Sequence, residues 1–118
     1  MHLVVSNKQK PSHVMLHDWL VGKPIHRRSS KWPAARAAHL KIEPACQWCG
    51  GTESPEVHHV LPVHVRPDLE LDPKNHITLC EARNKRCHLE KGHRGNWHDF
   101  EPKIRELCAA HKHSTKAA

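Results

Sequence analysis

Cysteine and histidine residues gather between positions 46 and 97, in an order that suggests two kinds of metal chemistry. Two pairs of cysteines bracket a double histidine, and another histidine directly follows the last cysteine of the set: Cys46, Cys49, His58, His59, Cys80, Cys87 and His88. Thiolates are typical ligands of a structural zinc ion, whereas imidazoles can hold a hydrolytic divalent ion or take up a proton near neutral pH. The stretch therefore predicts a structural metal site and a hydrolytic site in one small unit.

The cysteine spacing favours zinc over disulfides. Cys46 and Cys49 are separated by two residues, so a tight turn can bring both thiolates to one ion, and Cys80 and Cys87 would complete a tetrahedral site. Five cysteines are an odd number, which fits a disulfide framework poorly. Residues 81–86 separate the second pair, and this longer spacing leaves open that a histidine replaces Cys80. Cys108 lies outside the pattern and is expected to be a small, partly buried thiol.

The ordered set resembles the HNH endonuclease family, in particular the small HNH proteins of tailed bacteriophages, over roughly Arg28 to Trp97. The resemblance implies an α+β fold: a small zinc-stabilised ββα-metal (HNH) domain with an N-terminal helical and basic extension. It also implies metal-dependent hydrolysis of phosphodiester bonds in double-stranded DNA, leaving a 3′-hydroxyl and a 5′-phosphate. The expected cofactors are one structural Zn²⁺ and one catalytic Mg²⁺, Mn²⁺ or other divalent ion.

The same resemblance implies a role for each residue of the motif. His59 matches the general base, and His58 stands where many members carry an aspartate metal ligand. His88 matches a second metal ligand, His93 is a third candidate, and Asn75 matches the asparagine that orients the base. Since successive side chains of a strand point to opposite faces, His58 and His59 cannot share one site without local distortion. A supporting role for His58 is the alternative. Three other histidines are expected to be ordinary solvated or core imidazoles: His64, His76 and His98.

Glycine and proline residues, together with the spacing of apolar residues, divide the chain into three parts. Residues 1–27 form an arm in which a short helix can start near Ser12, residues 28–100 form the nuclease domain with its zinc knuckles, and residues 101–118 form a helix and a flexible tail after His111. Within the domain we expect a helix that is capped by Ser29 or Ser30 and ends near residue 43. Short strands are expected over 57–60 and 77–79, with a loop over 69–73 and a helix that starts at 87–91.

The formal net charge of +7 points to an acidic polymer as partner, because counterion release drives binding to nucleic acid. Candidate phosphate contacts lie before and within the first helix and between the second cysteine pair: Arg27, Arg28, Lys31, Arg36, Arg83, Lys85 and Arg86. The alternative is a solvated basic face. Trp32 and Trp48 are expected to pack inside the domain rather than stack on bases, and Trp97 is expected to pack on the small core.

A chain of 118 residues with 37% hydrophobic and 4% aromatic residues forms one domain with a small core that needs a metal for stability. No leader segment or membrane-length apolar run is visible, so we expect a cytoplasmic monomer or weak dimer in a bacterium or phage-infected bacterium. The resemblance adds the large terminase subunit of a phage as a partner, through genome packaging. The alternatives are a restriction or mobile-element nuclease and a non-catalytic zinc-stabilised DNA-binding module. The presence of His59, Asn75 and His88 together argues against the last.

Overall fold

A computed structural model describes residues 28–117, with side chains up to residue 112. The arm expected over residues 1–27, with Arg27, lies outside the described residues. The elements follow the order α2 (Trp32–Ile42), β1 (Pro55–His59), β2 (His76–Cys80), η3 (His88–Gly92) and α3 (Ile104–Ala117). Two short 3-10 turns, at Pro67–Leu69 and Pro73–Asn75, lie in the connection between the strands. The structure confirms the predicted α+β class, and both predicted strands form with slightly shifted ends. No helix in the described region is long and apolar enough to cross a membrane.

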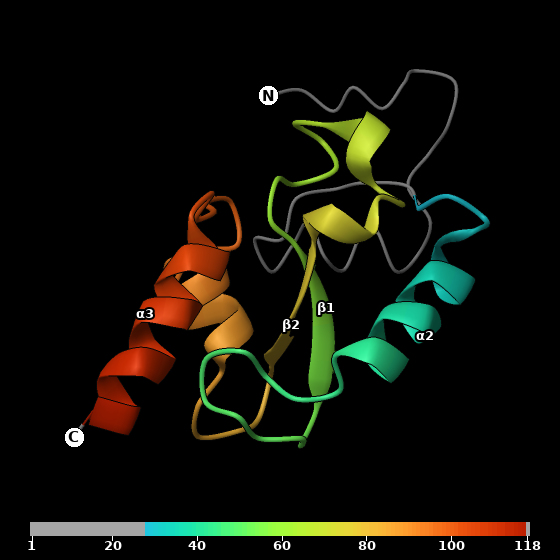
Figure 1. Ribbon diagram of the computed structural model, residues 1–118. Coiled ribbons are helices and arrows are strands. Elements are labelled where there is room, and N and C mark those ends of the chain that lie inside the picture. The colour runs from blue at the N-terminus through green and yellow to red at the C-terminus, as the bar shows by residue number, and fades with distance from the viewer. Residues whose placement is uncertain (1–27, 118) are drawn as a thin grey trace.

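The two strands form an antiparallel pair that separates the helices. Val57 lies opposite Thr78, and His59 lies opposite His76. Figure 1 shows α2 and α3 on opposite sides of this pair. Residues directly opposite in an antiparallel pair share a face, so His59 and His76 face α2, whereas His58 and Ile77 face η3 and α3.

The core between the sheet and α3 is small and rich in sulfur. Its buried members are Cys46, Ile77, Leu79, Cys80, Ala82, Cys87, Ile104 and Cys108. Cys108 is buried, as expected for a thiol outside the ligand pattern, and burial raises its pKa to about 11. With so few large apolar side chains, the domain has little hydrophobic stabilisation of its own.

The start of α2 differs from the predicted serine cap. Lys31 is the N-cap residue, and its side chain makes no capping hydrogen bond. A cap at Ser30 would need N–H donors from the next turn, but Pro33 has none and the Trp32 N–H already donates to the Ser29 carbonyl at 3.0 Å. The Ser29 hydroxyl accepts from the Lys31 N–H at 3.1 Å instead.

Glu43, directly after the end of α2, connects this helix to β2 and α3. Its Oε1 accepts from the Thr78 N–H at 2.9 Å, and its carbonyl accepts from the Thr78 hydroxyl at 2.6 Å. His39 and Arg105 also contact the carboxylate, at 3.0 and 3.2 Å. Burial by itself raises the pKa of Glu43, but the hydrogen bonds from Arg105 and Thr78 lower it further than burial raises it. The charged carboxylate therefore holds α2, β2 and α3 together.

Two predictions about the C-terminal half need correction. The helix expected to start at residues 87–91 is the single π-type turn η3, after which the chain bends at Arg94 and Gly95, both with positive φ. The helix α3 continues past His111 to Ala117, where the sequence predicts a flexible tail. No glycine or proline follows His111 to end it.

Candidate active site and metal centres

Four thiols converge at one end of the strand pair. The Sγ atoms of Cys46, Cys49, Cys80 and Cys87 all lie within 4.8 Å of one another, and the distance between Cys49 and Cys80 is 3.7 Å. A tetrahedral zinc site with bonds of about 2.3 Å has sulfur–sulfur edges of about 3.8 Å. A turn at residues 82–86, with the N–H groups of Lys85 and Arg86 bonded to the Ala82 carbonyl, brings Cys87 back beside Cys80. The cluster has the size and ligand set of a site that could hold zinc.

Backbone N–H groups point at these sulfurs. The Gly51 N–H donates to Cys49 Sγ at 3.4 Å, and the Cys49 N–H donates to Cys46 Sγ at 3.5 Å. Burial raises the pKa of Cys80, but hydrogen bonds from the backbone of Cys87 and Ala82 more than offset this and lower it. Burial raises the pKa of Cys87, so a thiolate at that position requires a neighbouring cation. Backbone N–H donors stabilise thiolates in this cluster, and the Cys87 thiolate also requires a cation nearby. Both features fit a bound metal ion.

Three histidines form a second cluster on the face of the sheet that meets η3. They are His58 from β1, His88 at the start of η3 and His93 directly after it, and their ligand nitrogens lie within 4.8 Å of one another. His58 is 2% exposed, and its Nε2 has no hydrogen-bond partner among the described residues. Burial is the main cause of a pKa of His58 well below the ordinary value, and the neighbouring His88 and His93 lower it further. A neutral, buried imidazole nitrogen without a hydrogen-bond partner fits a metal ligand.

The surroundings orient this second cluster. His93 Nδ1 lies 2.8 Å from the Asp99 carbonyl, which can only accept, so Nδ1 carries the proton and Nε2 offers its lone pair. The Trp97 ring lies 5.4 Å from the His88 ring and 4.9 Å from the His93 ring. The sequence predicts that Trp97 packs on the small core, but in the structure its ring packs on His88 and His93 instead.

His59 points to the opposite face of the sheet and is held in one tautomer. Its Nε2 donates to the Glu70 carbonyl at 2.8 Å, which leaves Nδ1 as the basic nitrogen. The Nη1 atom of Arg28 lies 3.4 Å from this Nδ1, and the guanidinium stacks over the Trp32 ring at 5.1 Å. The His59 ring itself lies 4.5 Å from the Trp32 ring. Trp32 is buried, as expected for a packing residue.

Asn75 organises the loop that carries the Glu70 carbonyl. Its side-chain oxygen accepts from the Leu61 N–H at 2.8 Å, and its amide donates to the carbonyls of Leu61 at 3.0 Å and Leu69 at 3.3 Å. The buried Asn75 thus fastens both ends of the loop between the strands, next to the carbonyl that orients His59.

The sequence assigned no site role to two residues around His59: it gave His76 as an ordinary imidazole and did not consider Glu70. The same Glu70 carbonyl accepts from His76 Nε2 at 2.8 Å, and the rings of His59 and His76 lie 5.1 Å apart. His76 is a buried core imidazole, and burial lowers its pKa. The contribution of Glu70 comes through its backbone oxygen, which carries no residue-type signal. A histidine directly opposite His59 was the available signal for His76.

One cleft reaches both histidine faces. It has a volume of about 220 Å³ and is lined by Arg28, Trp32, Arg36, Glu56, Val57, His58, His59, Pro62, Val63, His64, His88, His93 and Trp97. His58 and His59 both line this cleft although they lie on opposite faces of β1. The strand pairs regularly with β2, so the distortion expected for His58 and His59 is not needed for both to reach one cleft.

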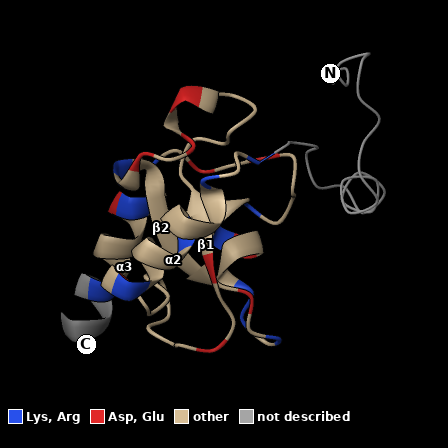
Figure 2. Cartoon of the chain, turned by 90° about the vertical axis from the view of Figure 1, so that its right-hand side faces the viewer, with Lys and Arg blue, Asp and Glu red and all other residues tan. Residues whose placement is uncertain are grey.

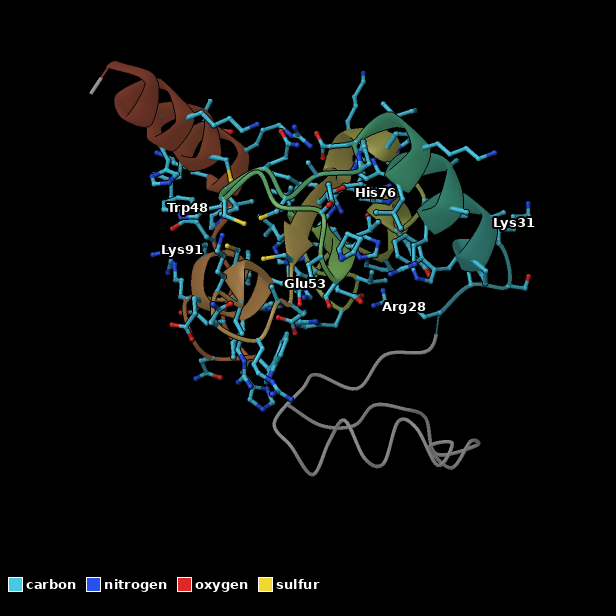
Figure 3. All side chains as sticks on the ribbon, turned by 90° about the horizontal axis from the view of Figure 1, so that it is seen from below. Arg28, Lys31, Trp48, Glu53, His76 and Lys91 are labelled. Carbon is cyan, nitrogen blue, oxygen red and sulfur yellow. The ribbon has the colours of Figure 1, made fainter. Side chains whose placement is uncertain are left out.

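The candidate phosphate contacts divide into two groups. Arg28 and Arg36 line the cleft and Lys31 is exposed beside them, although Arg36 also lies 3.5 Å from Glu56. Figure 3 shows Arg28 and Lys31 near the start of α2 and Trp48 and Lys91 on the other side of the molecule. The second group, Arg83, Lys85 and Arg86, does not line the cleft. Lys85 instead borders a hollow beside the thiols. Trp48 stacks on the His111 ring at 4.1 Å, which agrees with a packing role.

Residues 46–94 match the HNH endonuclease family model. The matched segment contains all four clustered thiols, the three clustered histidines, His59 and Asn75. No curated protein and no solved structure matches the chain. The match over residues 46–94 suggests nuclease activity on DNA, and the matched segment contains both clusters of candidate metal ligands.

Proposed function

We propose that this protein is a metal-dependent HNH endonuclease that hydrolyses phosphodiester bonds in double-stranded DNA. The observation that carries the proposal is the cleft shared by His59, with its basic nitrogen beside Arg28, and the cluster of His58, His88 and His93. A base, a set of ion ligands and a cationic side chain are the parts that phosphodiester hydrolysis requires.

His59 is the general base of the proposed reaction. Its Nδ1 takes a proton from water while the Glu70 carbonyl retains the proton on Nε2. The water oxygen forms a bond to phosphorus as the bond to the 3′-oxygen breaks. The departing 3′-oxygen takes up a proton from solvent water, so the products are a 5′-phosphate and a 3′-hydroxyl. Arg28, at the edge of the cleft, binds the phosphate that approaches His59.

Each metal centre has a separate task in this proposal. His58, His88 and His93 hold the catalytic divalent ion, which when bound stabilises negative charge on the phosphate and the departing oxygen. Cys46, Cys49, Cys80 and Cys87 hold a structural zinc, for which a closed set of four thiolates is typical.

Plasmid nicking tests the proposal across a series of Mg²⁺, Mn²⁺, Ni²⁺ and Co²⁺ concentrations, with a chelator as the metal-free arm. His59→Ala is expected to lower the cleavage rate by about 10²–10⁴-fold and to leave DNA affinity nearly unchanged, since loss of a general base acts on the transition state. His88→Ala is expected to shift activity to higher metal concentrations. His98→Ala, an exposed histidine that does not line the cleft, is the control. Unchanged nicking by His59→Ala would place the base elsewhere, with His58 the first candidate.

The biological setting follows from the resemblance to small phage HNH proteins. We propose that the protein is phage-encoded and acts in the bacterial cytoplasm with a large terminase subunit during genome packaging. Stimulation of terminase cleavage by the wild-type protein, and not by His59→Ala, would support this setting. Cleavage at one defined target sequence would favour a restriction or mobile-element nuclease. DNA binding without cleavage under every metal condition would indicate a non-catalytic zinc-stabilised module.

A further inference from the structure

Two ligands of the thiol cluster are each followed by a residue that faces the histidine cluster. Glu81 directly follows Cys80 at the end of β2, and His88 directly follows Cys87 at the start of η3. Because Cys80 and Cys87 meet at one site, the two following side chains are brought together as well. The Oε2 atom of Glu81 lies 3.9 Å from the Nδ1 atom of His88.

This pair of side chains is largely withdrawn from water. The Glu81 side chain is 29% exposed and the His88 side chain 16% exposed, and both Glu81 Oε1 and His88 Nδ1 are shielded from solvent. The backbone of Glu81 is also held in place, because its N–H donates to the Ser54 carbonyl at 2.8 Å. A carboxylate held in this environment interacts strongly with a neighbouring N–H group.

Ion-binding histidines usually donate their second ring proton to a carbonyl or carboxylate, which selects the tautomer and makes the other nitrogen a better ligand. His93 has such a partner in the Asp99 carbonyl. Beside His88 lies the Glu81 carboxylate, whose Oε2 is 3.9 Å from Nδ1, so the two side chains must approach further to form this hydrogen bond.

We propose that Glu81 is a positioning residue for the catalytic ion: it accepts the His88 Nδ1 proton and so directs Nε2 of His88 toward the ion. The proposal rests on the ion-binding part of the proposed function and does not require that DNA is cleaved. It also gives the thiol cluster a second effect. An ion bound by Cys80 and Cys87 sets the distance between Glu81 and His88, so the structural site organises the catalytic one.

Ni²⁺ titration by calorimetry on the zinc-loaded chain of 118 residues tests this role. Glu81→Met, which keeps the length of the side chain without an acceptor, is expected to weaken Ni²⁺ binding at the histidine cluster by about 10–100-fold. Glu81→Gln retains an acceptor oxygen and is expected to lose less. Glu90→Gln, an exposed glutamate two residues after His88, is the matched control. Zinc content is expected to stay at the wild-type value in all three.

The His88 tautomer supplies a readout that a purely structural role would not change. In the protein with zinc but no Ni²⁺, ¹⁵N spectra are expected to show the His88 proton on Nδ1, and this preference is expected to disappear in Glu81→Met. If His88→Ala weakens Ni²⁺ binding while the Glu81 variants keep wild-type affinity and tautomer, the role of Glu81 is overturned and the histidine site stands. If His88→Ala also leaves Ni²⁺ binding unchanged, the histidine site of the proposed function fails as well. Should Glu81→Met not fold, the spectrum and affinity of Glu81→Gln decide.

Discussion

Backbone carbonyls determine which ring nitrogen carries the proton at two of the candidate histidines. The Glu70 carbonyl holds the proton on His59 Nε2, and the Asp99 carbonyl holds it on His93 Nδ1. The first leaves a base facing Arg28, and the second leaves a ligand facing its cluster. Two residues of one type thus acquire different chemistry from the position of a single hydrogen bond.

At Gly92, the candidate ligand His58 leaves no space for a side chain. A Cβ atom there would lie 2.9 Å from Leu79 Cδ1 and 3.1 Å from His58 Nε2. Gly92→Ala is therefore expected to displace the imidazole, to reduce ion affinity at the histidine cluster and to destabilise the fold by about 1–3 kcal/mol. Ni²⁺ calorimetry and thermal unfolding measure both effects.

Gly51→Ala is the matched control for an added methyl group, because the nearest atom to its Cβ would be Cys49 Sγ at 3.5 Å, an ordinary contact. Wild-type Ni²⁺ affinity in Gly92→Ala would show that the close approach to His58 does not constrain the ion site.

At the scale of elements, the thiol cluster joins the turn after α2 to the end of β2 and the start of η3. Cys46→Ser is expected to release zinc and unfold the domain, since ion binding at such sites contributes folding free energy on the order of 10 kcal/mol. Cys108→Ser alters a buried thiol outside the cluster and is expected to retain one zinc per chain with a modest loss of stability. Metal analysis and circular dichroism measure both variants. A folded Cys46→Ser protein without zinc would contradict this dependence.

Glu43 makes the junction of α2, β2 and α3 sensitive to acid. Its pKa in the folded protein lies below the ordinary value of 4.5, so its stabilisation is present above that value and is lost as the pH falls through the lower folded pKa. Glu43→Gln is expected to cost about 1–3 kcal/mol at pH 7, as for hydrogen bonds to a charged group, and progressively less below pH 4.5. Denaturant unfolding of both proteins at each pH gives the difference, and Glu53→Gln, an exposed glutamate, is the control. A penalty that does not change with pH would exclude the charge as its origin.

At the scale of the whole molecule, the chain has a formal net charge of +7. Figure 2 shows lysine and arginine residues on several elements of the described part of the chain. Of the candidate phosphate contacts that the structure describes, Arg28 and Arg36 alone line the cleft. Each phosphate contact on duplex DNA contributes a slope of roughly −0.9 to the dependence of log affinity on log salt. Neutralising both arginines is therefore expected to make the slope shallower by up to ~2 and to weaken binding equally on unrelated sequences.

Lys74 and Lys103 are exposed and lie outside the cleft lining, so neutralising both removes the same charge as a control. An unchanged slope in the variant that lacks Arg28 and Arg36 would show that the two arginines belong to a solvated basic face. The loop with Arg83, Lys85 and Arg86 would then be the better candidate for the DNA contact.

The sequence by itself determined the strands, the grouping of the thiols and the identity of the candidate chemical groups. These depend on local signals: a two-residue spacing between cysteines, a proline after a short apolar run, and histidines at fixed places in an ordered motif. Local signals also located α2, but they misplaced its cap, because the loss of a donor at Pro33 depends on the detailed register of the first turn.

The tertiary structure decided how His58 and His59 divide between the two faces of β1 while both border one cleft. It also revealed the Glu70 carbonyl beside His59, the Glu81 carboxylate beside His88 and the missing space at Gly92. The contacts at Glu70 and Gly92 have no signature in residue order, and Glu81 and His88, although each follows a cysteine, meet only once the thiols converge. Residue types and their spacing along the chain predict which chemical groups a site contains. Which ring nitrogen of a histidine carries the proton depends on neighbouring groups that are brought together only in the folded protein.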